Sequence, residues 1–235
     1  GSGASVSLAP SAVTNKVTVG NLVLAWIGEQ PLTDGTLVDS SVTTDGSSVS
    51  AGGKITIAAV CDQEILNTAI AVAVSVAIAP DFASAAGAGS GASSTITTHN
   101  VIKSAVNGVS DLTVGGANGL SVTAADSGSN DITVGTAAAS LGWFGASIGI
   151  SLAELVNNDQ IVAEIQNSAI ETGGTSASGA PIEISATDTV HLKTDAVATS
   201  LSISIGASGA GGKSNITSNA EVAASLVDGS TVAAI

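Results

Sequence analysis

The chain has 235 residues and a formal net charge of −14, from 19 acidic residues and five lysines, with no arginine. A protein with a large negative net charge repels the phosphate backbone of a nucleic acid, so the composition argues against nucleic-acid binding. Hydrophobic residues make up 44% of the chain and aromatic residues 2%. Val and Ile recur with a period of two, which excludes a disordered chain and predicts a core built from aliphatic side chains.

Three short strand patterns recur along the chain, and their order never changes. Each alternates apolar residues with small or polar ones, as a β-strand does. The first is SVSLA at 5–9, SVAIA at 75–79, GISLA at 149–153 and, more loosely, SISIG at 202–206. The second is VLAWI at 23–27, IKSAV at 102–106, IVAEI at 161–165 and VAASL at 222–226. The third is GGKITIAA at 52–59, ANGLSVTA at 117–124 and GAPIEISA at 179–186.

These repeats predict one all-β unit over residues 1–235, a parallel β-helix (β-solenoid) of about three and a half irregular copies. Loop insertions fall between the first and second patterns. Strand signals arrive about every ten residues, which predicts coils of about 20 to 30 residues. The GSG at 1–3 is interpreted as a cloning scar, and the absence of Met and of a signal peptide indicates a mature or excised piece.

Two local predictions depend on the repeats. The stretch 151–171 has residues that favour a helix, but its IVAEI aligns with VLAWI, so we expect strand there. Alternate residues of the third pattern should point into a shared core. These residues are Ile55, Ile57, Leu120, Val122, Ile182 and Ile184.

Taken together, the patterns resemble the repeat regions of very large bacterial surface proteins of the filamentous-haemagglutinin and leukotoxin-like adhesin type. The likeness extends over the whole chain and is best at 145–186, where a GISLA strand leads through an Asn-containing loop to IVAEIQNSAI. The resemblance implies a secreted or cell-surface location and a structural or adhesive role in a fibre or stalk. The copies vary in length and no GGxGxD nonapeptide occurs, so it does not imply calcium-dependent folding.

The stretch TAIAVAVSVAIAP at 68–80 has one face of Ile and Val and a second face of Ala and Ser. We interpret the small residues of successive copies as a smooth column on one side of the solenoid. Loops of the same chain, such as 83–94, could cover this column, another copy could pack on it, or it could be ordinary surface. The predicted self-association face comprises Ala71, Ala73, Ser75, Ala77, Ser147, Gly149 and Ser151.

Self-association also has an axial route, because a solenoid exposes unpaired strand edges at both ends. We rank end-to-end stacking first and side-by-side packing through the small-residue column second. The expected partners are therefore copies of the same chain, forming an oligomer or fibre, with a glycan or cell-surface receptor as a further partner. The uncharged run at 132–153 is rich in Gly, Ser and Thr, which favours a strand pair over a membrane span.

Oxygen ligands for Ca²⁺ are available in two Asx-rich clusters, at 126–131 and 157–159. Asx turns explain these clusters equally well. The candidate cation ligands are Asp126, Asp131 and Asp159, and no other cofactor is predicted.

Catalysis is not predicted. The chain has no arginine to stabilise developing negative charge, and His99 and His191 have no spaced partners. Cys61 is the single cysteine and is expected to be a buried, inert thiol. The alternative function is a ligand-binding module, for glycan through Trp143 and Phe144 or for ice through Thr56, Thr113 and Thr133.

Overall fold

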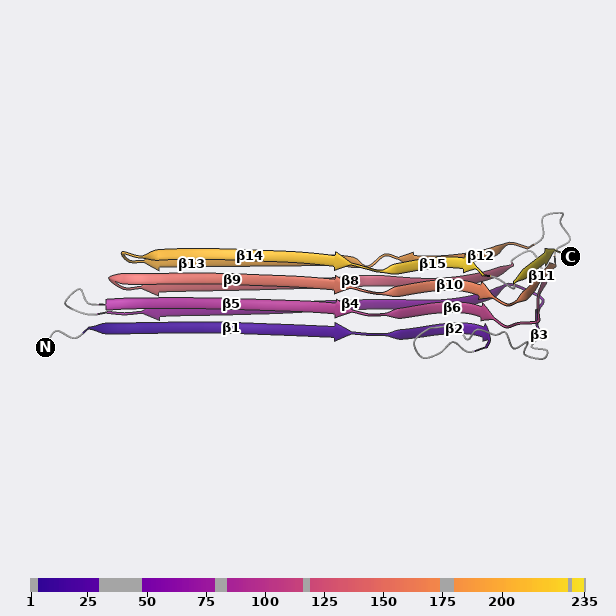
Figure 1. Ribbon diagram of the computed structural model, residues 1–235, viewed down its shortest axis with the longest axis horizontal. Helices are drawn as coiled ribbons and strands as arrows, with labels where there is room; N and C mark the ends of the chain where they lie inside the picture. The colour runs from indigo at the N-terminus through magenta and orange to yellow at the C-terminus, as the bar shows by residue number, and fades with distance from the viewer. Residues whose placement is uncertain are drawn as a thin grey trace.

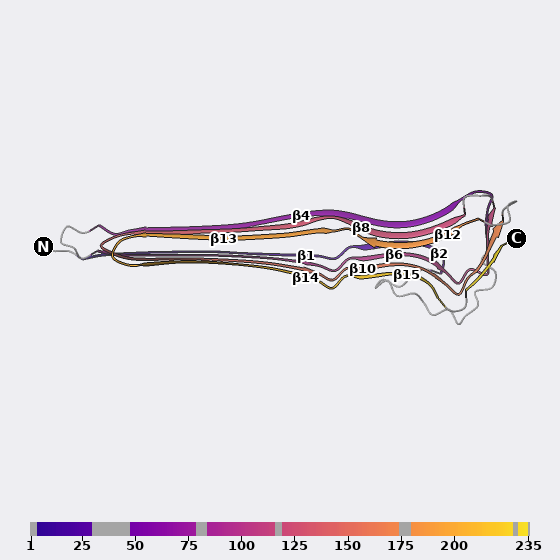
Figure 2. The ribbon, with the colours of Figure 1, turned by 90° about the horizontal axis from the view of Figure 1, so that it is seen from above.

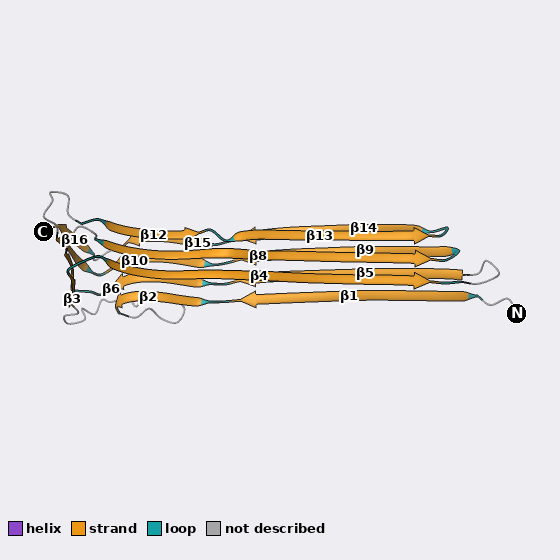
Figure 3. Ribbon diagram, turned by 180° about the vertical axis from the view of Figure 1, so that it is seen from behind, coloured by secondary structure: helices purple, strands orange, loops and turns teal. Residues whose placement is uncertain are grey.

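The structure is a computed structural model that describes residues 4–29, 48–78, 84–115, 119–173, 180–227 and 230–234. Within these ranges the regular structure is all β-strand, and every strand pairs in parallel with its neighbours (Figure 3). Strands recur in four stacks, so the chain winds as a parallel β-solenoid. The predicted fold class is confirmed, including strand instead of helix at 151–171.

Each coil passes through four sheets in the same order (Figure 1). Sheet A contains β1 (Ser5–Val19), β5 (Ser84–Thr98), β9 (Phe144–Asn157) and β14 (Ala207–Ser218). Sheet B contains β2 (Leu22–Gly28), β6 (Val101–Asn107), β10 (Gln160–Gln166) and β15 (Glu221–Leu226). Sheet C contains β3 (Ser48–Ala51), β7 (Asp111–Gly115), β11 (Ala169–Gly173) and β16 (Thr231–Ala234). Sheet D contains β4 (Ile55–Val76), β8 (Leu120–Leu141), β12 (Ile182–Asp188) and β13 (His191–Ile203).

The predicted coil length of 20 to 30 residues is wrong. One coil runs through β5, β6, β7 and β8, and therefore takes residues 84–141. The error arose because long strands were counted as several short ones. The signal near Ile132 lies in the middle of β8, and β12 and β13 pair successively with the two halves of that strand.

The second and third repeat patterns are confirmed in register. Val23, Ile102, Ile161 and Val222 are successive partners in sheet B. Ile55, Leu120 and Ile182 are successive partners in sheet D. The first pattern is wrong in register. The stretches 5–9 and 149–153 both lie in sheet A, but Gly149 aligns through Ser90 with Ser11 instead of Ser5. The residues 75–76 and 202–203 belong to the ends of β4 and β13 in sheet D.

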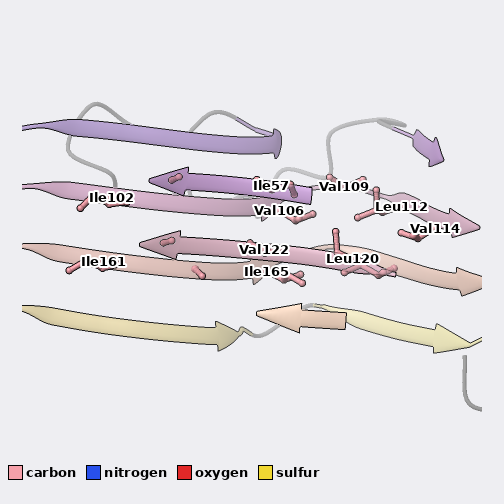
Figure 4. Packing of buried hydrophobic residues seen from close by; sticks show 14 of the residues in the cluster. Ile57, Ile102, Val106, Val109, Leu112, Val114, Leu120, Val122, Ile161 and Ile165 are labelled. Atoms are coloured by element: carbon pink, nitrogen blue, oxygen red, sulfur yellow. The ribbon is translucent and has the colours of Figure 1, made fainter. Parts of the chain in front are cut away.

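The core changes in thickness along the molecule (Figure 2). Around sheets B and C it is filled by Ile, Leu and Val, among them Ile161, Leu112 and Val122 (Figure 4). The predicted core residues of the third pattern are all in or against this cluster. Towards the ends of β4 and β8 the core narrows to alanine, with Ala73, Ala88 and Ala138 in contact. We call this narrow part, where sheets A and D lie face to face, the thin slab.

Candidate interaction surface

The predicted small-residue column lies inside the thin slab, not on its surface. Ala73 is 3% exposed and Ser75 is 1% exposed, whereas Val74 between them is 61% exposed. The predicted self-association face is therefore wrong in its orientation. Its residues point into the interior instead of toward solvent, in sheet D and in sheet A. The buried residues are Ala71, Ala73, Ser75 and Ala77 from sheet D, and Ser147, Gly149 and Ser151 from sheet A.

The small residues are buried because the two sheets approach too closely for larger side chains. A Cβ added to Gly149 in β9 would lie 2.7 Å from the carbonyl oxygen of Thr199 in β13. A Cβ on Gly212 in β14 would lie 2.6 Å from the carbonyl oxygen of Ala196. Glycine in a strand marks such close approaches of backbone.

Hydroxyl groups join the two sheets across this narrow interior. Ser75 Oγ donates a hydrogen bond to the Ser7 carbonyl oxygen at 2.7 Å, and Ser151 Oγ donates to the Val197 carbonyl. The segment that covers the small face of β4 is β5 of the same chain, since Ala88 contacts Ala73. Three explanations were considered for the small-residue column: cover by the same chain, contact with another copy, and ordinary surface. Cover by the same chain is the one that holds.

Nearer the wider part, Ile96, Ile132 and Val134 still fill the interior. Where the interior is alanine, the large aliphatic residues consequently point outward. On the outer face of sheet D, the D face, they form two ridges, one on β4 and one on β13. Between them β8 presents small residues, because Val72 aligns with Ala137 and then with Thr199, and Val74 aligns with Ala139 and then with Leu201. The ridges comprise Ile70, Val72, Val74 and Val76 on β4, and Val197, Leu201 and Ile203 on β13, all exposed.

The outer face of sheet A, the A face, is corrugated in the same way. Ile148, Ile150 and Leu152 form a ridge on β9, and their partners on β5 are Gly89, Gly91 and Ser93. On β14 the residues aligned with the β9 ridge are Gly209, Gly211 and Lys213. The first and third coils thus carry most of the large aliphatic residues of both faces, and the second and fourth coils carry mainly small ones.

Charge is segregated along the molecule. The described segments 4–15, 65–78, 84–98, 132–153 and 196–212 make up the thin slab and contain no Asp, Glu, Lys, Arg or His. The charged residues lie beside or beyond these segments, for example the Lys103–Glu164 ion pair of sheet B, at 3.1 Å. Most of the exposed large hydrophobic residues lie in the uncharged part. One end of the molecule is therefore an uncharged body with aliphatic side chains on both faces.

A buried polar cluster lies where the thin slab joins the wider part. Asp126 of sheet D and Asp159, which precedes β10, are 0% and 1% exposed. Asn100 joins them: its backbone N–H donates to Asp159 Oδ1 at 2.6 Å, and its side-chain Nδ2 donates to Asp126 Oδ2 at 3.4 Å. Thr98 Oγ1 donates to Asp159 Oδ2 at 3.2 Å.

Burial governs the protonation of this cluster. Loss of solvent, with the nearby charges of Asp159 and Asp188, raises the pKa of Asp126 to about 6. Burial also raises the pKa of Asp159, against the opposing effect of its hydrogen bonds from Asn100 and Thr98. The Cys61 thiol is buried beside Asp126, and its pKa is raised by desolvation and then by that charge. The expected burial of Cys61 is confirmed.

The predicted cation ligands are not brought together. Asp126 and Asp159 are neighbours inside the solenoid, but Asp131 lies on the opposite side of β8, where its charge acts on Lys193. In the described ranges no group of three or more His, Cys, Asp or Glu side chains could hold a metal ion. The structure therefore separates Asp131 from Asp126, which the sequence placed in one cluster.

The residues proposed for ligand binding are also dispersed. Thr113 lies in sheet C, and within sheet D Thr133 aligns with Thr68, whereas Thr56 aligns with Ser121. Trp143 and Phe144 are exposed where β8 turns into β9. His99 and His191 are exposed and lie on different strands or connections.

No protein-family model, curated protein or solved structure matches this chain. Among the residues described here, no helix has the length and apolar character needed to cross a membrane. The fold and the two corrugated faces define a β-solenoid with an uncharged, aliphatic-faced slab. Membership of the adhesin family stays a prediction from the sequence.

Proposed function

We propose that this chain is a structural module of an extracellular fibre or cell-surface stalk, and that it acts by associating with copies of itself. The single observation that carries the proposal is the exposure of rows of large aliphatic side chains on both faces of an uncharged slab. The largest contiguous apolar patch on a soluble monomer is typically about 300–600 Å² and is often functional, and larger patches mark sites of association. The extracellular location and the adhesive role rest on the family resemblance.

Catalysis has no part in this proposal. The carboxylates whose pKa values are raised by burial, Asp126 and Asp159, lie inside the solenoid. They accept hydrogen bonds from Asn100 and Thr98. A substrate would have to enter between two hydrogen-bonded sheets to reach them. Their placement suits a structural junction.

Self-association should be visible in solution as a mass that rises with protein concentration. Apolar faces drive it, and the net charge of −14 opposes it, so added salt should strengthen association by screening that charge. Sedimentation velocity over a wide concentration range, at low and at moderate salt, measures both effects. Electron microscopy of concentrated samples should then show bundled or elongated particles.

The contradicting result is equally direct. A mass equal to one chain at every concentration and salt level would make the module a passive spacer. Association that weakens with added salt would instead indicate contacts between opposite charges, and would contradict the role of the uncharged slab.

A further inference from the structure

We propose that the D face is the docking surface for a second copy of this chain, with the β4 ridge of each copy seated in the groove over β8 of the other. This inference rests on the proposed function and specifies its contact. Its basis is the shape of the D face, the distribution of charge around it and the area it offers.

The groove is a defined hollow. Its floor is formed by Ala137 and Ala139 of β8, and its walls by Val72 and Val74 on one side and Thr199 and Leu201 on the other. The hollow has a volume of about 190 Å³. At one end Leu141, which is 44% exposed, interrupts the run of small residues. The groove is therefore one strand wide and lined mainly by apolar groups.

The ridges have the dimensions of the groove. Strands in a sheet lie about 4.8 Å apart, so the ridges on β4 and β13 are separated by about 10 Å, with a single small-residue strand between them. A ridge formed by one strand is the shape that fits between two such ridges. Identical corrugation on a second copy supplies that shape at the same spacing, as in the interdigitated sheets of steric zippers.

Two-fold symmetry fills the groove of both copies at once. If β4 of one copy enters the β8 groove of the other, the two-fold axis places the second β4 in the first groove. The contact is thus closed and self-complementary, and it gives a dimer through the D face. Each interface uses the same three strands from both partners.

Charge and area agree with this partner. The strand segments 65–78, 132–153 and 196–212 carry no ionisable side chain, so two copies can meet without burying unpaired charge. A patch nine residues long on each of three neighbouring strands has a flat area of about 400 Å² per copy. Two copies bury about 800 Å² before corrugation is counted, close to the lower limit of about 1,000 Å² for specific contacts. We therefore expect a concentration-dependent dimer.

The D face fits this contact better than the A face. Its β4 ridge is continuous, with exposed residues at every second position from Ile70 to Val76, and Ile78 just beyond the strand is exposed as well. On the A face the large residues of β1 end at Leu8, because the next outward positions are Pro10 and Ala12. Leu8 also leans over the A-face groove, where its Cδ2 atom lies 2.9 Å from the position of a Cβ on Gly87.

Filling the groove with apolar side chains tests the inference. The double variant Ala137→Leu, Ala139→Leu makes the D face more hydrophobic but removes the space for the ridge. We expect a dimer dissociation constant at least tenfold higher than that of the parent, measured by sedimentation. The matched control is Gly89→Leu, Gly91→Leu on the A face, where an added Cβ meets open space, and this variant should dimerise like the parent.

A second variant tests the same contact without adding bulk to the floor of the groove. Val74→Lys puts a charge on the β4 ridge at a position 61% exposed in the single copy. It should also raise the dissociation constant at least tenfold, with an unchanged circular dichroism spectrum.

Several results would overturn the inference while leaving self-association intact. These are unchanged or tighter association of the groove-filled variant, loss of association in the A-face control, and loss through a proline in the edge strand β1 or β14 with the D-face variants unaffected. Binding to neutral lipid vesicles by a chain that stays monomeric would overturn it as well. A parent chain that is monomeric at all concentrations contradicts the proposed function itself.

Discussion

Gly149→Val is expected to lower the free energy of unfolding by about 3 kcal/mol, the upper range for inserting bulk into a packed interior. The reason is the close approach of sheets A and D in the thin slab. A Cβ at this position would lie 2.7 Å from the Thr199 carbonyl oxygen and 3.2 Å from Thr136 Oγ1. Both atoms belong to strands held in register by sheet D, so the sheets must separate locally. Urea denaturation followed by circular dichroism measures the loss.

Gly91→Val is the matched control, since Gly91 lies in the neighbouring strand β5 of the same sheet but points to the A face. A Cβ there has no atom within 4 Å. Valine is a better strand former than glycine, so we expect stability equal to that of the parent or higher by about 0.5–1 kcal/mol. Equal losses in the two variants would contradict the assignment of the small residues to the interior.

The repeat order in the sequence predicted the fold well in the wider part of the solenoid. There the patterns mix large aliphatic residues with charged ones, as in IVAEI at 161–165. Charge on alternate residues marks the outer face, so the register of sheets B and D could be predicted from Ile161 and Leu120. The structure confirms these positions as buried partners of residues in adjacent coils.

In the thin slab the same reasoning assigned the faces the wrong way round. Neither face of 68–78 carries charge, so alternation indicates a strand without indicating which side is buried. Large residues usually face the core. Here the separation of two sheets, a tertiary property, decides that Ala73 and Ser75 lie inside. The same ambiguity explains why 75–79 was aligned with strands of sheet A.

One signal in the sequence points to the corrugated faces. Glycine alternates with small residues in SAAGAGSGASS at 84–94 and again in ASGAGG at 207–212, whereas GASIGISLA at 145–153 between them alternates Ile and Leu with small residues. A comparison of every second copy would have shown a two-coil period. The pairing of the two carboxylates could be found only in the structure. Asp126 lies in sheet D and Asp159 in the connection from sheet A to sheet B, and the two meet through the winding of the coil.

Asp126→Asn is expected to raise the free energy of unfolding by about 3 kcal/mol at neutral pH. The pKa of Asp126 rises from 3.8 to about 6 on folding, and each unit corresponds to about 1.4 kcal/mol. A raised carboxyl pKa favours the protonated folded state, so this contribution is full at low pH and is lost as pH rises through about 6. Asparagine removes the charge and retains an oxygen to accept from Asn100.

The pH dependence separates this explanation from a general change in packing. The difference between parent and variant should fall by about 2 kcal/mol between pH 7.5 and pH 4.5, where the parent carboxyl is largely protonated in the folded state. Asp62→Asn is the control, since Asp62 lies next to Cys61 on β4 but is exposed, and it should change stability by less than about 0.5 kcal/mol at either pH. A calcium-dependent rise in the parent's stability that Asp126→Asn abolishes would instead show that the buried carboxylates hold a cation, because a bound divalent ion stabilises the ionised pair that burial otherwise disfavours.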